Sequence, residues 1–298
     1  MRHALPLLFA CLLWPAHAAD WQPFLWHTGS VDGGPVERLA IVLPITVDGI
    51  ACNAQLDTGA NEAVIWHGQA PAVAVATPAA AQPRKVLVEF AGLRSYASAA
   101  PAVLAQLTSD ACKIGVIATL GNAFFEQGTV TLDLGGARVA YAPQSLLAND
   151  PNAQPLFYAR WASTGGHTLV EVAQADQPAG YALLDTGSAR FGLNATSAAE
   201  WATLTNNTPL QAGDKVRKYS IRSWGRDIDC YETRAAGDFT VGKQPVAAMQ
   251  ASYCVDQGFR APVRLIGVLG LKPLGDRVLT IDYPGRRWKL AEPASPTP

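Results

Sequence analysis

The sequence predicts an all-β protein built from two related lobes. The tripeptide Asp-Thr-Gly occurs twice, at Asp57 and at Asp185, each time after a short apolar run. Two copies arise by chance in only about a tenth of a percent of chains of this length. A second pair of similar segments follows with equal spacing: Leu120-Gly121 and Thr131-Leu132-Asp133 in the first half, Leu269-Gly270 and Thr280-Ile281-Asp282 in the second. Such a repeat indicates a duplicated structural unit.

Apolar runs separated by turn signals predict the strands of each half. Residues 39–47 and 50–56 flank Asp48-Gly49, and Asp-Gly between apolar runs is a strong hairpin signal. This hairpin is expected to end at Asp57. Residues 168–172 and 181–184 are expected to do the same for Asp185. Further hairpins are predicted over 130–141 and 278–290, and a short helix over 197–203.

The paired motifs resemble those of the two-lobed aspartic peptidases of the pepsin and retropepsin-like superfamily. In that family each lobe contributes an Asp-Thr-Gly and a later hydrophobic-hydrophobic-Gly, which here reads Thr119-Leu120-Gly121 and Val268-Leu269-Gly270. The resemblance implies a pepsin-like acid protease fold of two β-barrel-like lobes. It implies that Asp57 and Asp185 are the catalytic residues, facing each other in the cleft between the lobes. It also implies that Thr58 and Thr186 hydrogen-bond across the lobes.

The residues around each aspartate suit this chemistry. Gly59 and Gly187 have no Cβ atom, so two backbones can approach closely there. Two adjacent carboxylates cannot both ionise at low cost, so they share a proton and their pKa values split. The ionised carboxylate can then take a proton from water while its neighbour protonates the scissile carbonyl. We expect no metal and no other cofactor.

The two motifs differ in the residue that follows them. Ser188 offers a hydroxyl to Asp185, whereas Ala60 offers no equivalent group to Asp57. A hydrogen bond to a carboxylate favours its charged form. We therefore expect Asp185 to be the more readily ionised member of the pair.

The first residues and the cysteines indicate an exported protein. Residues 1–18 have the pattern of a secretory signal peptide, and their apolar run is too short to span a membrane. We expect a secreted or periplasmic protein without a membrane anchor. Four cysteines then remain, an even number in an oxidising compartment. Three pairings are possible; we expect one bridge within each lobe, Cys52 with Cys112 and Cys230 with Cys254.

The expected domain limits follow from the repeat. We place the N-terminal lobe at 20–148, the C-terminal lobe at 149–291 and a disordered tail at 292–298. A hairpin over 86–97 is predicted to form a flap over the cleft, with Tyr96 as a candidate ring above the two aspartates. An ordinary half-buried strand tyrosine is the alternative reading of Tyr96.

The charge composition argues against a nucleic-acid-binding function. A net charge of −1 with 16% charged residues leaves no basic surface for nucleic acid. We predict a monomeric, secreted aspartic endopeptidase that acts on peptide or protein substrates. The alternative is a non-catalytic binding or inhibitor protein of the same fold, but neither Asp-Thr-Gly is eroded. General proteolysis and a dedicated processing role remain open, as do cleavage specificity and the optimal pH.

Overall fold

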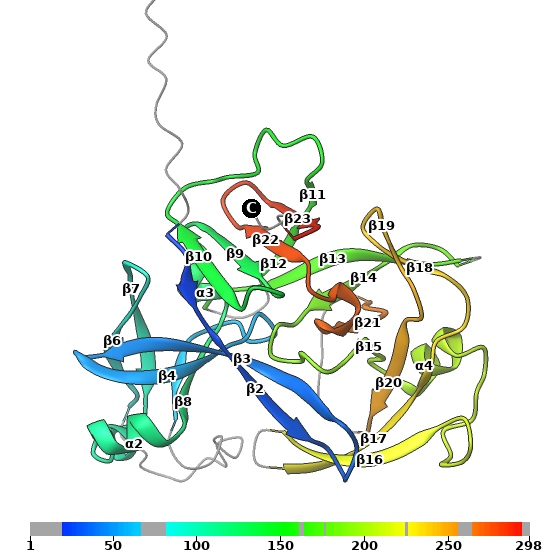
Figure 1. The fold of residues 1–298 in the computed structure, drawn as a ribbon, viewed down its shortest axis with the longest axis horizontal. Helices are drawn as coiled ribbons and strands as arrows, with labels where there is room; N and C mark the ends of the chain where they lie inside the picture. Colours follow the sequence, from blue (N-terminus) through cyan, green and yellow to red (C-terminus); the bar gives the residue numbers. More distant parts are fainter. Residues whose placement is uncertain are drawn as a thin grey trace, which may run out of the picture.

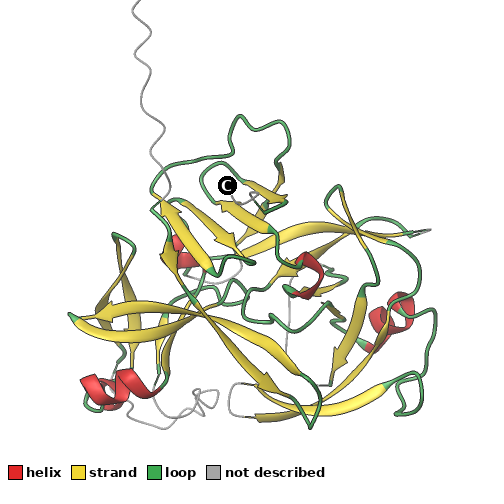
Figure 2. Cartoon of the chain, viewed as in Figure 1, coloured by secondary structure: helices red, strands yellow, loops and turns green. Residues whose placement is uncertain are grey.

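The computed structural model describes residues 20–66, 82–160, 164–175, 177–223, 226–255 and 264–293. The predicted signal peptide and residues 294–298 of the predicted tail lie outside this part of the chain. The described chain is mostly β-strand, with a few short helices (Figure 2). Its sheets form two barrel-like lobes joined by a third sheet, which confirms the fold class predicted from the sequence.

An antiparallel six-stranded sheet joins the two lobes (Figure 1). Each half of the chain contributes three of its strands. The two middle strands are the repeated segments themselves, and Thr131 is the register partner of Thr280. Segments related in sequence are therefore neighbours across the boundary between the lobes. In order, the strands are β1 (Gln22–Pro23), β10 (Arg138–Ala142), β9 (Thr129–Asp133), β22 (Val278–Asp282), β23 (Arg287–Ala291) and β11 (Gln154–Pro155).

The N-terminal lobe is a seven-stranded sheet. The predicted hairpin that leads to Asp57 is present, and its turn residues Asp48 and Gly49 have φ of 47° and 83°. Positive φ at both positions is typical of the turns that match strand twist. In order, the strands are β2 (Leu25–Ser30), β3 (Val36–Val47), β4 (Ile50–Leu56), β8 (Val116–Leu120), β5 (Val64–Ile65), β7 (Leu93–Ala99) and β6 (Arg84–Phe90).

The C-terminal lobe is a ten-stranded sheet with β16 at one edge. In order, its strands are β16 (Arg217–Ser223), β17 (Arg226–Arg234), β20 (Gln250–Cys254), β15 (Leu193–Asn194), β21 (Gly267–Leu269), β14 (Gly180–Leu184), β13 (His167–Gln174), β18 (Phe239–Val241) and β19 (Gln244–Val246), with β12 (Phe157–Ala159) pairing with β13. The second predicted hairpin, β13 with β14, delivers Asp185.

The described helices are short and lie at the ends of strands. They are α1 (Pro101–Leu104), α2 (Ser109–Ile114), α3 (Asn122–Phe125), α4 (Ala198–Leu204) and the 3₁₀ turn η1 (Lys272–Leu274). The helix predicted over 197–203 is α4. Its N-cap is Ser197, whose hydroxyl accepts a hydrogen bond from the Glu200 N–H at 3.1 Å, which satisfies one of the free donors of the first turn.

Two disulfides each lie within one lobe. Cys52 of β4 is bonded to Cys112 of α2, and Cys230 is bonded to Cys254, its register partner on the next strand. These are the pairings expected from the sequence. No helix among the described residues is both long and apolar enough to cross a membrane.

Candidate active site

Each Asp-Thr-Gly begins where a buried strand ends. Strand β4 runs parallel to β8, and β14 runs parallel to β21. The Asp57 N–H donates to the Leu120 carbonyl at 3.1 Å, and the Asp185 N–H donates to the Leu269 carbonyl at 2.9 Å. The repeated hydrophobic-hydrophobic-Gly segments therefore hold the two aspartates. The same short sequence produces the same local geometry in each lobe.

The two carboxylates meet between the lobes, and the glycines allow this. A Cβ atom on Gly59 would lie 2.6 Å from the Asp185 Cγ, and one on Gly187 would lie 2.6 Å from the Asp57 Cγ. Either would collide with the opposite carboxylate, so any larger residue would force the pair apart. The side chains of Asp57 and Asp185 hydrogen-bond to each other.

Backbone and side-chain donors hold each carboxylate in place. The N–H groups of Gly59 and Ala60 donate to Asp57 Oδ1 at 2.9 and 3.2 Å. On the other side, the Gly187 N–H donates to Asp185 Oδ1 at 2.8 Å. The Ser188 hydroxyl donates to Asp185 Oδ2 at 2.7 Å, a bond that has no counterpart at Ala60.

The pKa of Asp57 is raised well above its usual value. The largest cause is loss of hydration between the lobes, followed by the negative charge of Asp185. The hydrogen bonds from Gly59 and Ala60 act in the opposite direction and are outweighed. Burial and the neighbouring carboxylate therefore both favour the protonated form of Asp57. Ser188 gives Asp185 a side-chain donor that Asp57 lacks, and the expectation that Asp185 ionises more readily stays a prediction.

The threonines of the two motifs lock the loops together. The Thr58 hydroxyl donates to the Leu184 carbonyl at 2.7 Å and accepts from the Thr186 N–H at 3.0 Å. The Thr186 hydroxyl donates to the Leu56 carbonyl at 3.0 Å and accepts from the Thr58 N–H at 3.0 Å. Both side chains are buried. Neither loop can shift without breaking bonds made by the other.

Asn122 supports the site and was missed by sequence reasoning. It is fully buried, and its amide donates to the carbonyls of Thr58 at 2.7 Å and Gly166 at 2.9 Å. Its Oδ1 accepts from the Tyr283 hydroxyl at 2.8 Å. It therefore connects one aspartate loop to the other lobe and to the central sheet. The available signal was its place after the first hydrophobic-hydrophobic-Gly, where the second half has Leu271 instead.

His167 lies at the start of β13 and interacts with the first aspartate loop. Its ring hydrogen-bonds to the Gly59 backbone and is attracted electrostatically by Asp185, and both interactions favour the protonated ring. Loss of hydration is larger and lowers the pKa of His167 below its usual value. A neutral imidazole therefore supports the first aspartate loop.

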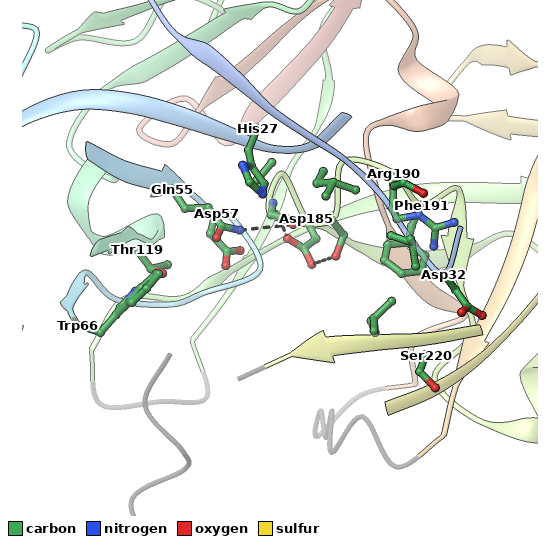
Figure 3. Close-up of a pocket in the computed structure, with 17 residues that line it drawn as sticks. His27, Asp32, Gln55, Asp57, Trp66, Thr119, Asp185, Arg190, Phe191 and Ser220 are labelled. Carbon is green, nitrogen blue, oxygen red and sulfur yellow. Dashed lines mark hydrogen bonds between the residues drawn. The ribbon is translucent and has the colours of Figure 1, made fainter. Parts of the chain in front are cut away.

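A cavity of about 560 Å³ opens above the aspartates (Figure 3). Trp66 and Thr119 lie on the Asp57 side, where the Trp66 Nε1 donates to the Thr119 hydroxyl at 3.1 Å. Phe191 and Asp32 lie on the Asp185 side. Residues of both lobes line the cavity: His27, Ser30, Val31, Asp32, Leu39, Ala40, Gln55, Asp57, Trp66 and Thr119 from the first, and Asp185, Gly187, Ser188, Arg190, Phe191, Ser220 and Ile221 from the second.

Tyr96 is not brought to this cavity. The hairpin predicted over 86–97 exists as β6 and β7, but Tyr96 is 64% exposed and is not part of the cavity wall. Its neighbour Ala97 is buried, and successive strand residues point to opposite faces. Tyr96 therefore points away from the core of the lobe. The β2–β3 hairpin borders the cavity instead.

No protein-family model and no curated protein matches the chain. Among solved structures, an aspartic proteinase from Irpex lacteus is similar, with a TM-score of 0.47 and 11% sequence identity. The alignment covers 93% of this chain and 98% of that one.

Proposed function

We propose that the protein is an aspartic endopeptidase that hydrolyses peptide bonds with Asp57 and Asp185. The observation that carries this proposal is the pair of carboxyl groups, hydrogen-bonded to each other at the base of a cavity that both lobes line. One of them keeps its proton because its pKa is raised. A site that offers one acid and one base to the same water molecule suits general acid and base catalysis.

In this mechanism, ionised Asp185 takes a proton from a water molecule whose oxygen attacks the scissile carbonyl carbon. Asp57 gives its proton to the carbonyl oxygen, and a tetrahedral diol forms. The proton on Asp185 then passes to the amide nitrogen, the C–N bond breaks, and the diol returns a proton to Asp57 as the new carboxyl forms. Protons and electrons balance, and no covalent bond to the enzyme is made.

We also propose that the protein is exported and that residues 1–18 are its signal peptide. The two disulfides support an oxidising compartment. N-terminal sequencing of the protein recovered outside the cytoplasm tests this, and the expected first residue is Ala19 or Asp20. Recovery of the intact chain from the cytoplasm with reduced cysteines would contradict it.

The test of the activity is cleavage of a mixed peptide library from about pH 3 to about pH 8. We expect cleavage by the wild-type protein and none by Asp57→Asn or Asp185→Asn. Each variant removes one ionisable carboxyl and keeps the shape of the side chain. If the folded wild-type protein cleaves no peptide at any pH, the peptidase proposal fails and a binding role is favoured.

A further inference from the structure

The β2–β3 hairpin of the N-terminal lobe reaches the C-terminal lobe beside the aspartates. In Figure 1 this hairpin runs from the centre of the molecule toward β16 and β17. The Arg217 guanidinium donates to the Val31 carbonyl at 2.7 Å. The Val31 side chain packs against a cluster that includes Phe191 and Tyr219. The tip of the hairpin is therefore anchored to the opposite lobe.

Asp32 is held at the tip by a tight turn. The Gly34 N–H donates to the Val31 carbonyl at 3.0 Å, and the Ser30 hydroxyl donates to the Gly34 carbonyl at 2.6 Å. Asp32 and Gly33 have φ of 51° and 68°, as the central residues of a type I′ turn require. With anchors on both sides, the position of Asp32 in the cavity wall is fixed.

The other charged residues of this hairpin have partners, but Asp32 does not. Glu37 pairs with Lys272 at 2.7 Å and with Arg190 at 3.3 Å, and Arg38 pairs with Asp276 at 2.8 Å. No hydrogen bond or ion pair joins the Asp32 side chain to another described residue. Arg217, at the same turn, is directed to the Val31 carbonyl and lies over the Tyr219 ring.

Among the described residues that line the cavity, the net charge is negative on this side. Arg190 is buried and is neutralised by Glu37 and by Glu232, at 3.2 Å. Asp32 therefore adds to the charge carried by the aspartate pair. The cavity wall also contains apolar side chains, Val31, Leu39, Phe191 and Ile221, together with the polar residues Arg190 and Ser220. An aliphatic stem that ends in a cation would bury its stem against such a wall and keep its charged end at the carboxylate.

We propose that Asp32 is a specificity residue that binds a cationic group of the substrate on the Asp185 side of the scissile bond. This inference rests on the proposed peptidase function and adds a substrate class to it. The cation has two sources in a peptide: the side chain of Lys or Arg, or the free α-amino group at the N-terminus. Both offer N–H donors with positive charge to a carboxylate.

The first test compares the wild-type protein with Asp32→Asn on matched peptides. Asparagine keeps the shape of the side chain and tolerates positive φ, so the turn should form. In a first series of peptide pairs, the two members carry Lys or norleucine at one position near the scissile bond, and each position is tested in turn. In a second pair, the two peptides differ only by acetylation of the N-terminus. We expect the wild-type protein to prefer the cationic member of one pair by about two- to fivefold in kcat/KM. Asp32→Asn should lose that preference.

The pair that responds identifies the source of the cation. A response to norleucine assigns a Lys or Arg side chain, and a response to acetylation assigns the N-terminus. Asp214→Asn is the matched control, because Asp214 is exposed and is not part of the cavity wall. It should keep the wild-type preference. Equal preference in wild-type and Asp32→Asn would overturn the inference while leaving the peptidase proposal intact.

A binding measurement keeps the inference testable without catalysis. Peptides with a neutral, uncleavable hydroxyethylene in place of the scissile bond are titrated into wild-type protein and Asp32→Asn by calorimetry. The cationic member should bind wild-type protein about two- to fivefold more tightly than its neutral match, and this difference should vanish in the variant. The difference should also shrink as salt is added, because the pair is partly exposed. Equal affinities in both proteins would overturn the inference even if no peptide were cleaved.

Discussion

Thr58 and Thr186 each accept a hydrogen bond from the other's backbone N–H at 3.0 Å. Each hydroxyl also donates to a carbonyl that precedes the opposite aspartate, of Leu184 or Leu56. The exchange is reciprocal because the two loops are copies of one sequence that face each other. A single substitution therefore disturbs both loops, including the one that keeps its own threonine.

Removing one of these hydroxyls should weaken both the fold and the arrangement of the aspartate pair. Thr58→Val keeps the size of the side chain but leaves the Thr186 N–H without its acceptor. It also removes the shorter of the two hydrogen bonds to the Leu184 carbonyl, which would keep only the bond from the Thr168 hydroxyl at 3.2 Å. We expect a loss of about 2–4 kcal/mol in the free energy of unfolding, measured by denaturant titration, and a lower kcat. Thr203→Val is the control, since its hydroxyl bonds to Ala199 on an exposed helix face. Equal effects of the two substitutions would contradict this account.

The pH profile of cleavage should respond to a hydroxyl placed beside Asp57. The proposed mechanism requires Asp57 protonated and Asp185 ionised, so under it the loss of activity at high pH reports the proton leaving Asp57. Ala60→Ser would add a donor that favours ionised Asp57 and so lowers the raised pKa of Asp57. The high-pH limb of the kcat/KM profile should move to lower pH. An unchanged limb, with the serine in place, would argue against the assignment of the proton to Asp57.

Asp57 should also make the fold less stable at neutral pH. Its folded pKa is raised above the value of 3.8 expected for an unfolded chain, so the folded state binds a proton that the unfolded state releases. The contribution of Asp57 to the free energy of unfolding is then most favourable below about pH 4, and it is lost as the pH rises through the folded pKa. Asp57→Asn should raise the melting temperature at pH 7 and leave it nearly unchanged at pH 3. A stabilisation of equal size at both pH values would show another cause.

Arg190 should be needed for the stability of the contact between the lobes. It is 4% exposed and pairs with Glu232, which is 7% exposed, and with Glu37 on the β2–β3 hairpin. Arg190→Gln would leave a buried carboxylate without its cation, at a cost of about 3–5 kcal/mol in the free energy of unfolding.

The matched control for this prediction is Arg264→Gln. Arg264 also pairs with a glutamate, Glu200, at 2.9 Å, but its side chain is 77% exposed. Exposed pairs contribute about 0–1 kcal/mol. Denaturant titration of both variants compares a buried with an exposed cation. Similar losses in the two variants would mean that Arg190 does not stabilise the fold through its buried carboxylates.

Local sequence signals predicted the strands that deliver the aspartates. The Asp48-Gly49 turn between two apolar runs is sufficient to define the β3–β4 hairpin. The repeated Asp-Thr-Gly, through its resemblance to the paired motifs of the two-lobed aspartic peptidases, implied that Asp57 and Asp185 would face each other. The equal spacing of the later segments indicated a duplicated unit, and in the structure its copies pair at Thr131 and Thr280 in the central sheet.

Long-range contacts could not be predicted in this way. The hairpin that borders the cavity begins with β2, whose sequence Leu25–Ser30 lacks a regular alternation of apolar and polar residues. It is a strand because it pairs with β3, and its tip is placed by Arg217 of the other lobe. The suggestion that Tyr96 lies above the aspartates does not match the structure for a related reason. The alternation of side chains along β7 directs Tyr96 away from the core, and the sequence alone does not reveal which hairpin reaches the cavity.

His167 should make the fold sensitive to acid. Its folded pKa is lowered below the usual 6.5 by loss of hydration, so the unfolded chain binds a proton more readily than the folded one. Stability should therefore fall as pH drops through about 6.5 toward the folded pKa. His167→Gln removes this contribution and keeps a side chain that can donate to the Gly59 backbone. The decrease in melting temperature from pH 7.5 to pH 5.5 should be smaller in this variant. His27→Gln, which removes an exposed ring and keeps the buried one, should retain the wild-type decrease; if the two variants behave alike, the buried imidazole is not the acid-sensitive group.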